Sequence, residues 1–387
     1  MQRRCERIPM LTSGTGTSRE LTFHRYGEAG QGPKAYLQAA LHADETPGLL
    51  VLHHLIRLLD AAAAEGGILG EIVIAPYANP IGLDQHIYGY HFGRYHVGGG
   101  GNFTRNWLDL TEPAAEALKG KLGADPAVNV ATIRRTFRAM VEEHLAKLAP
   151  DTLGAELIHY RLHLAREAVD ADLVLDLHCD LEALMHLFLI PAHWPEGQDI
   201  AAELGCRAVL LAEDSGGASF DEAFSTPWTR LAQRFPDNPI PAACLSGTVE
   251  LRGRGDVSDE LAEADARALL RILQRRGLVG GEPGPLPDAL CKATRLDAVD
   301  VLRAPAKGVL TYKVALGDSV KEGDLVAEVV DPAAENPGEA RTPVLARTDG
   351  LILSRHVQFY VTQGTSIAKI VGEKPLPHRA GGNLLED

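Results

Sequence analysis

The apolar positions of this chain form short continuous runs and stretches with helical spacing, and the two kinds alternate over most of its length. Continuous runs are typical of buried strands, and apolar residues three and four apart are typical of one face of a helix. Buried strands are predicted at 35–41, 71–77 and 170–180, and helices at 47–59, 129–149 and 259–277. Strands that alternate with helices predict an α/β fold with a mixed, largely parallel sheet flanked by helices.

The pattern changes after a stretch rich in Gly and Pro at 280–287, where short strands separated by turns begin. This part contains a weak internal repeat. Residues 304–310 match 346–352, and residues 320–330 match 361–371. Two similar β units predict a small pseudo-symmetric barrel or sandwich. We therefore expect an α/β domain over 1–290, a β domain with two similar half-units over 291–373, and a tail over 374–387.

The segment at 317–324 resembles the turn of biotinyl and lipoyl domains, which suggests a carrier or other non-catalytic binding protein. A carrier needs a lysine at the hairpin tip between its two half-units, where the prosthetic group is attached. The connecting stretch at 331–343 contains no lysine, so the sequence disfavours a carrier. A binding protein built on the β repeat remains an alternative from another class.

The charge of the chain bears on its partners. Lys and Arg number 38 against 52 Asp and Glu, which gives a net charge of −14, and no run of basic residues interrupts this balance. Such a surface repels phosphate backbones, so we expect no nucleic-acid partner. A small-molecule substrate fits better, and a homo-oligomer is compatible with the sequence.

Cysteine use and the absence of targeting signals indicate a compartment. The cysteines are odd in number and scattered without a CxxC pair, which fits reduced thiols better than disulfides. They are Cys5, Cys179, Cys206, Cys244 and Cys291. The first ten residues are not followed by the apolar core of a signal peptide, and no uninterrupted apolar run reaches about 18 residues. We expect a cytoplasmic protein without a membrane partner.

The first candidate for site chemistry is the pair His42 and Glu45, in HxxE between a predicted strand and a helix. Ligands collect at the carboxyl ends of strands in open α/β sheets, and this spacing across a turn lets an imidazole and a carboxylate converge. Zinc accepts such ligands, and a catalytic zinc site uses three protein groups plus water. HxxE alone is also compatible with a helix-entry His and a Glu that interacts with the helix dipole.

His178 follows the apolar run 173–177, and it is our candidate for the third ligand. The alternative is a hydrogen-bonded core histidine, since a buried imidazole needs a partner. The neighbouring Cys179 is a rival ligand, but alternation along a strand would place it on the opposite face. The pair His53 and His54 is predicted to pack or face solvent within a helix. Three further histidines lie in a Gly-rich loop and are weaker metal candidates, namely His86, His91 and His96.

Glu250 and Arg105 complete the candidates. Glu250 stands in a short strand at a position where an apolar pattern would place Val or Leu, and a buried carboxylate beside a metal suits a general base. The alternative is a surface glutamate paired with Arg252. Arg105 offers a bidentate fork for a substrate carboxylate, or it is an ordinary structural arginine.

The motifs taken together resemble a known family. HxxE at His42 and Glu45 is followed by NPIG at 79–82, GNFTRNW at 101–107, DLH at 176–178 and VEL at 249–251. This order is similar to that of the succinylglutamate desuccinylase/aspartoacylase family, relatives of the zinc carboxypeptidases, over about residues 30–275. Within the family the chain most resembles N-acetyl-diaminobutyrate deacetylases. The β repeat resembles the C-terminal domain of these enzymes.

The resemblance implies a function and a set of roles. His42, Glu45 and His178 would hold one zinc ion per chain, Glu250 would act as general base and acid, and Arg94 would polarise the scissile carbonyl. Arg105, with Asn102 and Thr104 beside it, would bind the substrate. The family usually has Asn where this chain has Thr104, and a threonine lacks the amide donor.

We therefore expect a zinc-dependent amidohydrolase that deacylates a small N-acyl amino acid. A metallocarboxypeptidase acting on peptides is the alternative among enzymes, because the site chemistry is shared.

Overall fold

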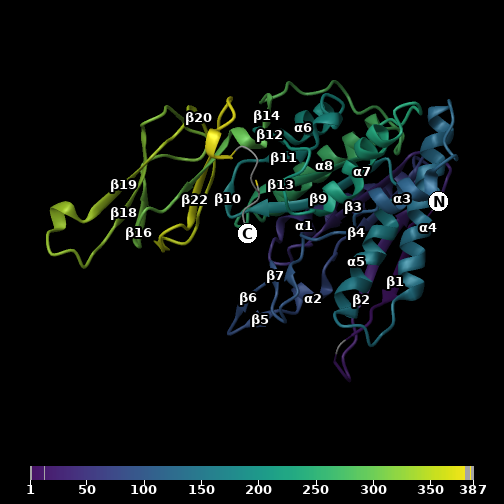
Figure 1. Ribbon diagram of the computed structural model, residues 1–387, viewed down its shortest axis with the longest axis horizontal. Helices are drawn as coiled ribbons and strands as arrows, with labels where there is room; N and C mark the ends of the chain where they lie inside the picture. Colours follow the sequence, from purple (N-terminus) through teal and green to yellow (C-terminus); the bar gives the residue numbers. More distant parts are fainter. Residues whose placement is uncertain (1, 13, 380–383, 385–387) are drawn as a thin grey trace.

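The computed structural model describes residues 2–12, 14–379 and 384. Its centre is a nine-stranded sheet (Figure 1). In spatial order the strands are β1 (Arg4–Pro9), β2 (Glu20–Tyr26), β4 (Glu71–Ala75), β3 (Lys34–Ala39), β9 (Leu173–Asp180), β13 (Leu245–Gly253), β11 (His186–Leu189), β12 (Ala208–Leu211) and β14 (Ala293–Arg295). The pairs β3–β4, β3–β9, β9–β13, β11–β12 and β12–β14 are parallel, which confirms the mixed, largely parallel sheet.

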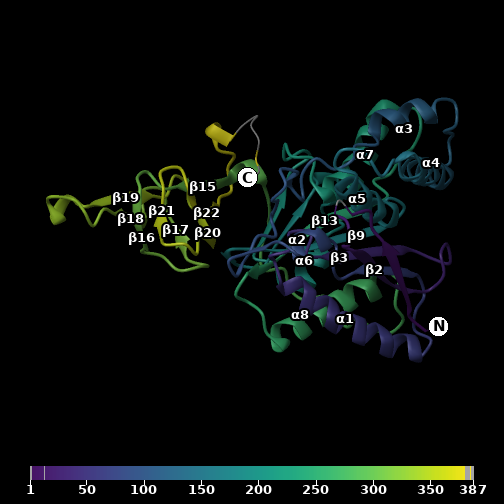
Figure 2. The same ribbon diagram turned by 90° about the horizontal axis from the view of Figure 1, so that it is seen from below.

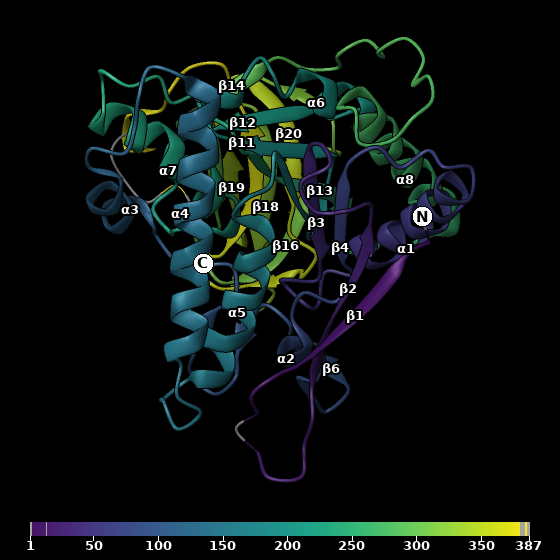
Figure 3. The ribbon, with the colours of Figure 1, turned by 90° about the vertical axis from the view of Figure 1, so that its right-hand side faces the viewer.

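Helices cover both faces of this sheet (Figure 2). One face packs against α1 (Pro47–Ala64), α6 (Gln198–Leu204) and α8 (Asp259–Arg275). The other face packs against α3 (Thr111–Leu118), α4 (Pro126–Lys147), α5 (Ala155–Ala168) and α7 (Phe220–Arg234). Helices α4 and α5 run side by side over this second face (Figure 3). The two apolar cores on either side hold the sheet in the middle of the domain.

Helix α1 is long and apolar enough to cross a membrane by length and composition alone, with a mean hydropathy of 1.2. Half of it is buried within the chain, against the sheet and α8. That position is the one expected for a core helix, because its apolar residues are already covered.

The predicted helices and strands appear with shifted ends. Helix α8 begins after Ser258, whose side chain accepts a hydrogen bond from the Leu261 backbone N–H and so caps the helix. Helix α4 begins earlier than its apolar periodicity indicated, because Asp125 caps it and Pro126 occupies the first turn. The sequence pattern missed the hairpin of β1 and β2, strands β11 and β12, and helices α5 and α7.

The Gly-rich loop between β4 and α3 contains regular secondary structure. It contains the short helix α2 (Pro80–Leu83) and two small hairpins. These hairpins pair β5 (His86–Ile87) with β6 (Tyr90–His91), and β7 (Tyr95–His96) with β8 (Gly101–Asn102). Single turns of 3₁₀ helix occur elsewhere, at η1 (Pro191–His193), η2 (Leu296–Ala298), η3 (Pro337–Glu339) and η4 (Pro377–Arg379).

The C-terminal strands form two further sheets at one end of the molecule (Figure 1). One sheet contains β10 (Glu182–Ala183), β20 (Gly350–Arg355), β22 (Ser366–Val371) and β15 (Val299–Arg303), with β17 (Ser319–Val320) beside β20. The other contains β19 (Arg341–Leu345), β18 (Leu325–Val330), β16 (Gly308–Tyr312) and β21 (Tyr360–Val361). The internal repeat is visible in this arrangement. Strand β17 of the first half pairs with β20 of the second, and β21 of the second half pairs with β16 of the first.

The junction between the two parts lies between β14, which still joins the nine-stranded sheet, and β15, which begins the C-terminal sheets. The expected domain limits near residues 290 and 373 stay predictions. Of the expected tail, residues 380–383 and 385–387 lie outside the described residues.

The C-terminal sheets contact the α/β domain at residues just after His178. Strand β10 pairs with β20, and Arg355 makes two hydrogen bonds with Glu182, at 3.1 and 2.9 Å. Lys369 Nζ lies 2.7 Å from Asp180 Oδ2. These ion pairs fix the β domain against the strand end at which the candidate site lies.

Candidate active site

The three residues expected to hold zinc lie together at the carboxyl end of the central sheet. His42 follows β3, Glu45 precedes the first turn of α1, and His178 lies near the end of β9. Because β3 and β9 are parallel neighbours, their carboxyl ends meet at one edge. One ligand atom of each residue lies within 4.8 Å of the others, and all three side chains are buried. Among the described residues, this is the only such group of His, Cys, Asp or Glu side chains.

The Glu45 carboxylate lies between the imidazoles of His42 and His178. Its Oε1 lies 2.9 Å from His42 Nδ1, and its Oε2 lies 2.8 Å from His178 Nδ1. The backbone N–H of Cys179 also donates to Oε2, at 3.1 Å. Cys179 therefore contributes to the site through its backbone, while its thiol stays outside the metal-binding group.

A chain of hydrogen bonds orients the His178 imidazole from its Nε2 side, away from Glu45. His178 Nε2 lies 2.9 Å from Asp176 Oδ2, and the other oxygen of Asp176 accepts from Gln38 Nε2 at 3.0 Å. Gln38 Oε1 in turn accepts from the Tyr36 hydroxyl at 2.8 Å. All four residues are buried. A carboxylate on the outer nitrogen of a histidine is the usual way in which proteins fix a metal-binding imidazole.

His42 is held by the motif that was expected to bind substrate. Its Nε2 lies 2.8 Å from Asn102 Oδ1 and 3.1 Å from Thr104 Oγ1. Thr104 Oγ1 accepts a hydrogen bond from Arg105 Nη1 at 2.7 Å. Thr104 and Arg105 also line the cavity, but Asn102 lies behind the imidazole and is not among the lining residues. In the structure Asn102 contacts the candidate ligand His42. The expected part of Asn102 in substrate binding stays a prediction.

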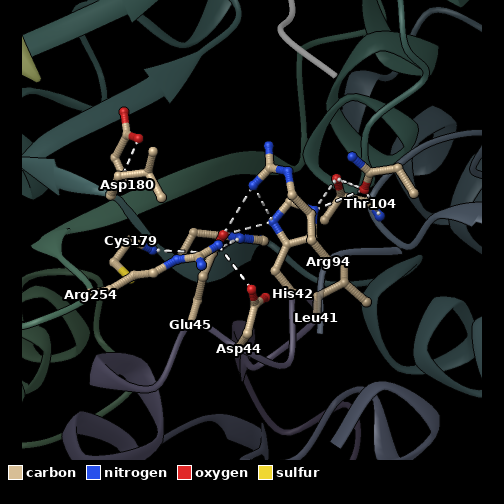
Figure 4. Close-up of polar contacts among 12 residues, drawn as sticks. Leu41, His42, Asp44, Glu45, Arg94, Thr104, Cys179, Asp180 and Arg254 are labelled. Atoms are coloured by element: carbon tan, nitrogen blue, oxygen red, sulfur yellow. Dashed lines mark hydrogen bonds and ion pairs between the residues drawn. The ribbon is translucent and has the colours of Figure 1, made fainter. Parts of the chain in front are cut away.

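The Arg94 guanidinium contacts two members of the cluster, Glu45 and His42. Its Nη1 lies 3.2 Å from both Glu45 Oε1 and His42 Nδ1 (Figure 4). The preceding Gly93 lies against the HxxE turn, and its carbonyl accepts from the Ala43 N–H at 2.9 Å. A Cβ at Gly93 would lie 2.0 Å from the Asp44 nitrogen, so only glycine permits this approach.

Glu250 occupies the strand next to His178. The two residues are direct partners in the parallel pair of β13 and β9, so their side chains lie on the same face of the sheet. Glu250 Oε2 is buried and has no hydrogen-bond partner within the described part of the chain. Burial, together with the negative charge of Glu45, raises the pKa of Glu250 to about 8.

The pKa values of Glu45 and His178 are shifted in opposite directions from their usual ranges. Burial would raise the pKa of Glu45, but the neighbouring His42 and His178 hold it well below its usual range. Burial alone would lower the pKa of His178, but Asp176 and Glu45 raise it well above its usual range. Both ring nitrogens of His178 therefore face carboxylates, and these carboxylates favour its protonated form. A metal ion that binds Nδ1 would replace the proton at that nitrogen.

The remaining candidate histidines lie away from this cluster. His54 pairs with Asp259 at 2.9 Å between α1 and α8, and His86 stacks on His91 across the first small hairpin. His96 Nδ1 accepts from the Gly100 backbone N–H at 3.1 Å.

The cluster opens into a cavity of about 540 Å³. Arg254 lines this cavity and pairs with Asp44 of the HxxE turn at 2.9 Å. Arg252, considered from the sequence as a partner of Glu250, instead pairs with Asp265 of α8. The reason is a left-handed backbone at Arg252, with φ of 63°, which interrupts the alternation of β13. The β domain also lines the cavity, and nothing in the sequence pattern indicated this.

Comparison with known proteins identifies the family. The model of the succinylglutamate desuccinylase/aspartoacylase catalytic domain matches residues 31–276, well over half of the chain. The chain belongs to this family. It is therefore related to deacylases that hydrolyse amides, as its motif order indicated.

Individual relatives agree with this assignment. A stretch of 121 residues is 31% identical to the Nα-acetyl-L-2,4-diaminobutyric acid deacetylase of Halomonas elongata, and it covers 31% of this chain and 35% of that protein. The alignment thus spans about a third of the curated relative's length.

Solved structures share the fold over nearly the whole chain. A family member from Shewanella frigidimarina is 22% identical with a TM-score of 0.82, and the match covers 96% of this chain and 97% of that one. One from Shewanella amazonensis is 24% identical with a TM-score of 0.79, covering 96% and 98%. The ectoine utilization protein EutE (DoeB) from Ruegeria pomeroyi is 18% identical with a TM-score of 0.65, covering 96% and 95%. At these identities the likeness establishes the fold.

Proposed function

We propose that this member of the family is a zinc-dependent hydrolase that removes the acyl group from a small N-acyl amino acid. The observation that carries the proposal is the position of Glu250, a buried carboxylate with an unpartnered oxygen, directly opposite His178 in the His42–Glu45–His178 cluster. A general base beside a three-residue donor set is the arrangement that metal-assisted amide hydrolysis requires.

The donor set fits zinc. Two imidazole nitrogens and one carboxylate converge, which is a frequent set in catalytic zinc sites and leaves a fourth position for water or substrate. The outer nitrogens of both imidazoles already have partners in Asp176 and Asn102, so the inner nitrogens are the ones directed at the ion. When bound there, zinc supplies Lewis acidity, which acidifies water and polarises a carbonyl.

The protein's own groups supply the proton transfers and the positioning. With its pKa raised to about 8, Glu250 can accept a proton from water and later deliver it to the departing amine near neutral pH. Arg94 brings a guanidinium to the inner edge of the cluster, where negative charge develops on the carbonyl oxygen. Arg105, joined to the His42 side through Thr104, can receive the carboxylate of the amino acid.

Two measurements test this proposal together. Protein purified in zinc-containing buffer should hold about one zinc ion per chain. The loaded protein should release amine from members of a panel of N-acetyl, N-succinyl and N-formyl amino acids, which should include N-acetyl-diaminobutyrate because of the curated relative's name. Release from peptides with a free C-terminus, and not from any N-acyl amino acid, would identify a carboxypeptidase instead. Zinc-loaded protein that hydrolyses neither class would overturn the proposal.

A further inference from the structure

Part of the cavity wall beyond Glu250, on β11 and β12, is apolar, and this follows from the strand order. On the sheet face that carries the site, β9 presents Asp176 and His178, and β13 presents Thr248 and Glu250. The next strand, β11, places Phe188 opposite Thr248, and β12 places Leu210 beside Phe188. On β11 the residue opposite Glu250 is His186, so the polar surface continues there, and the surface becomes apolar at Phe188 and Leu210.

The β domain lines the cavity opposite this apolar strip with apolar residues and also with polar ones, which include Arg303, Thr365 and Arg379. Phe188, Leu210 and Ala212 of the α/β domain line the cavity together with Leu296, Val299 and Val301 from the C-terminal part. Most of these residues belong to one apolar cluster that bridges the two parts of the chain. Phe188 and Ala212 are only partly buried, so part of their apolar surface faces the cavity. We call these six residues the apolar chamber.

The volume of the cavity also indicates a substrate larger than an N-acetyl amino acid. The cavity, at about 540 Å³, falls in the range of roughly 300–1,000 Å³ that is typical of pockets for drug-sized ligands. An N-acetyl amino acid is far smaller and would leave the apolar chamber filled with water. Apolar surface in contact with water is unfavourable, and a ligand that covers it gains affinity.

The order of the strands assigns the chamber to one end of the substrate. Arg105 is connected through Thr104 to His42, which follows β3, on one side of the cluster. The chamber lies on β11 and β12, on the other side of β13. A substrate with its carboxylate at Arg105 and its amide at the cluster therefore directs its acyl group toward Phe188 and Leu210.

We infer that the apolar chamber is an acyl-binding subsite and that the preferred substrates are N-acyl amino acids with a medium-chain aliphatic acyl group. This inference rests on the proposed deacylase function. Two strand spacings separate β13 from β12, about 10 Å. An extended chain advances about 1.2 Å per bond, since a residue of three bonds spans roughly 3.3–3.6 Å. The chamber therefore accommodates an acyl group of about six to eight carbons.

An acyl-length series tests the inference. The zinc-loaded full chain is assayed with the N-acetyl, N-butanoyl, N-hexanoyl, N-octanoyl and N-dodecanoyl derivatives of one amino acid. We expect kcat/KM to rise about fourfold per buried methylene up to hexanoyl or octanoyl, and to stop rising at dodecanoyl. A value that is highest for acetyl, or that is the same for all lengths, would overturn the acyl-binding subsite and leave the deacylase function in place.

A pair of variants tests whether the apolar chamber causes the acyl-length preference. Ala212→Phe shortens the chamber, so the ratio of kcat/KM for octanoyl over acetyl should fall at least tenfold. Val309→Phe adds the same bulk on the exposed surface of β16, and it should leave the ratio at the wild-type value. An unchanged ratio in folded Ala212→Phe would place the acyl group elsewhere.

A binding measurement keeps the test independent of turnover. Octanoate should raise the Tm of the zinc-loaded protein more than acetate at equal concentration, and Ala212→Phe should reduce that difference. Should Ala212→Phe fail to fold, Val301→Phe narrows the same chamber from the β domain. Equal shifts with octanoate and acetate would overturn the subsite. If no N-acyl amino acid were hydrolysed, the deacylase proposal would fail separately from this comparison.

Discussion

His178 and Glu250 are direct partners on the neighbouring parallel strands β9 and β13. This register places a metal-ligand candidate and a general-base candidate side by side on one face of the sheet, although 71 residues of sequence lie between them. The same pairing accounts for the electrostatics of Glu250, because it brings this carboxyl into a buried region next to the charge of Glu45.

Replacing Glu250 with Gln tests its role in proton transfer. The amide is nearly isosteric but cannot accept a proton, so we expect kcat to fall by about 10²–10⁴ while zinc content and Tm stay close to wild type. Glu20→Gln, at an exposed position of β2, is the matched control and should retain full turnover. Near-normal kcat in Glu250→Gln would move the base to another carboxylate near His178, such as Asp180 or Glu182.

Removing the central ligand tests the metal site. Glu45 lies between both imidazoles, so Glu45→Gln should lower the zinc content well below one ion per chain after dialysis. Zinc content by atomic emission spectroscopy is the measurement. Glu65→Gln, on the exposed end of α1, should bind as much zinc as the wild type. Full zinc content in Glu45→Gln would show that the ion binds elsewhere.

Asp176 should act on the metal through His178. Asp176→Asn weakens the charge that orients the imidazole, and we expect zinc affinity to fall by roughly 10–100-fold in competition with a chelator. Because Asp176 does not bind the ion itself, excess zinc should restore the stoichiometry. Asp214→Asn, at an exposed position, should have wild-type affinity. Equal affinity in both variants would contradict the positioning role.

Arg105 should act on substrate affinity. Arg105→Lys keeps the charge but loses the planar fork, so we expect KM for carboxylate-bearing substrates to rise about tenfold or more. If carboxylate binding also positions the scissile carbonyl, kcat falls as well. Arg135→Lys on the exposed side of α4 serves as the control. An Arg105→Ala enzyme with unchanged kcat/KM would show that the carboxylate binds at another group.

A buried ion pair away from the site should control acid stability. Glu167 lies 2.8 Å from Arg25 and is 1% exposed. Burial alone would raise the pKa of Glu167, but Arg25 lowers it to about 2 from an ordinary 4.5. A carboxyl whose pKa is lower in the folded state stabilises the fold above pH 4.5, and this contribution is lost as the pH falls toward 2.

We therefore expect Glu167→Gln to reduce the free energy of unfolding by about 3 kcal/mol at pH 7 and by much less near pH 2 to 3. Urea unfolding at several pH values measures the difference. Glu143→Gln removes an exposed pair with Lys147 and should change the stability little at any of these pH values. A difference for Glu167→Gln that does not shrink with acid would argue against this ion pair as its cause.

The sequence by itself determined the local elements and the chemistry-bearing residues. The strands at β3 and β9, the helices α1 and α8 and the order of HxxE, DLH and VEL are all readable from neighbouring residues. Apolar periodicity reports which face of one element is buried, and helix caps such as Ser258 act within a single turn. Such features depend on positions only a few residues apart, so the linear pattern contains them.

Only the tertiary structure decided how these residues meet. Asn102 contacts His42, Arg252 turns to Asp265 while Arg254 reaches Asp44, and the β domain lines the cavity. Each of these contacts depends on strand register, on one left-handed backbone position or on the packing of two domains. Register and domain packing are set by the simultaneous burial of many residues far apart in the sequence, and a pattern of neighbouring residues does not specify which distant partners they will face.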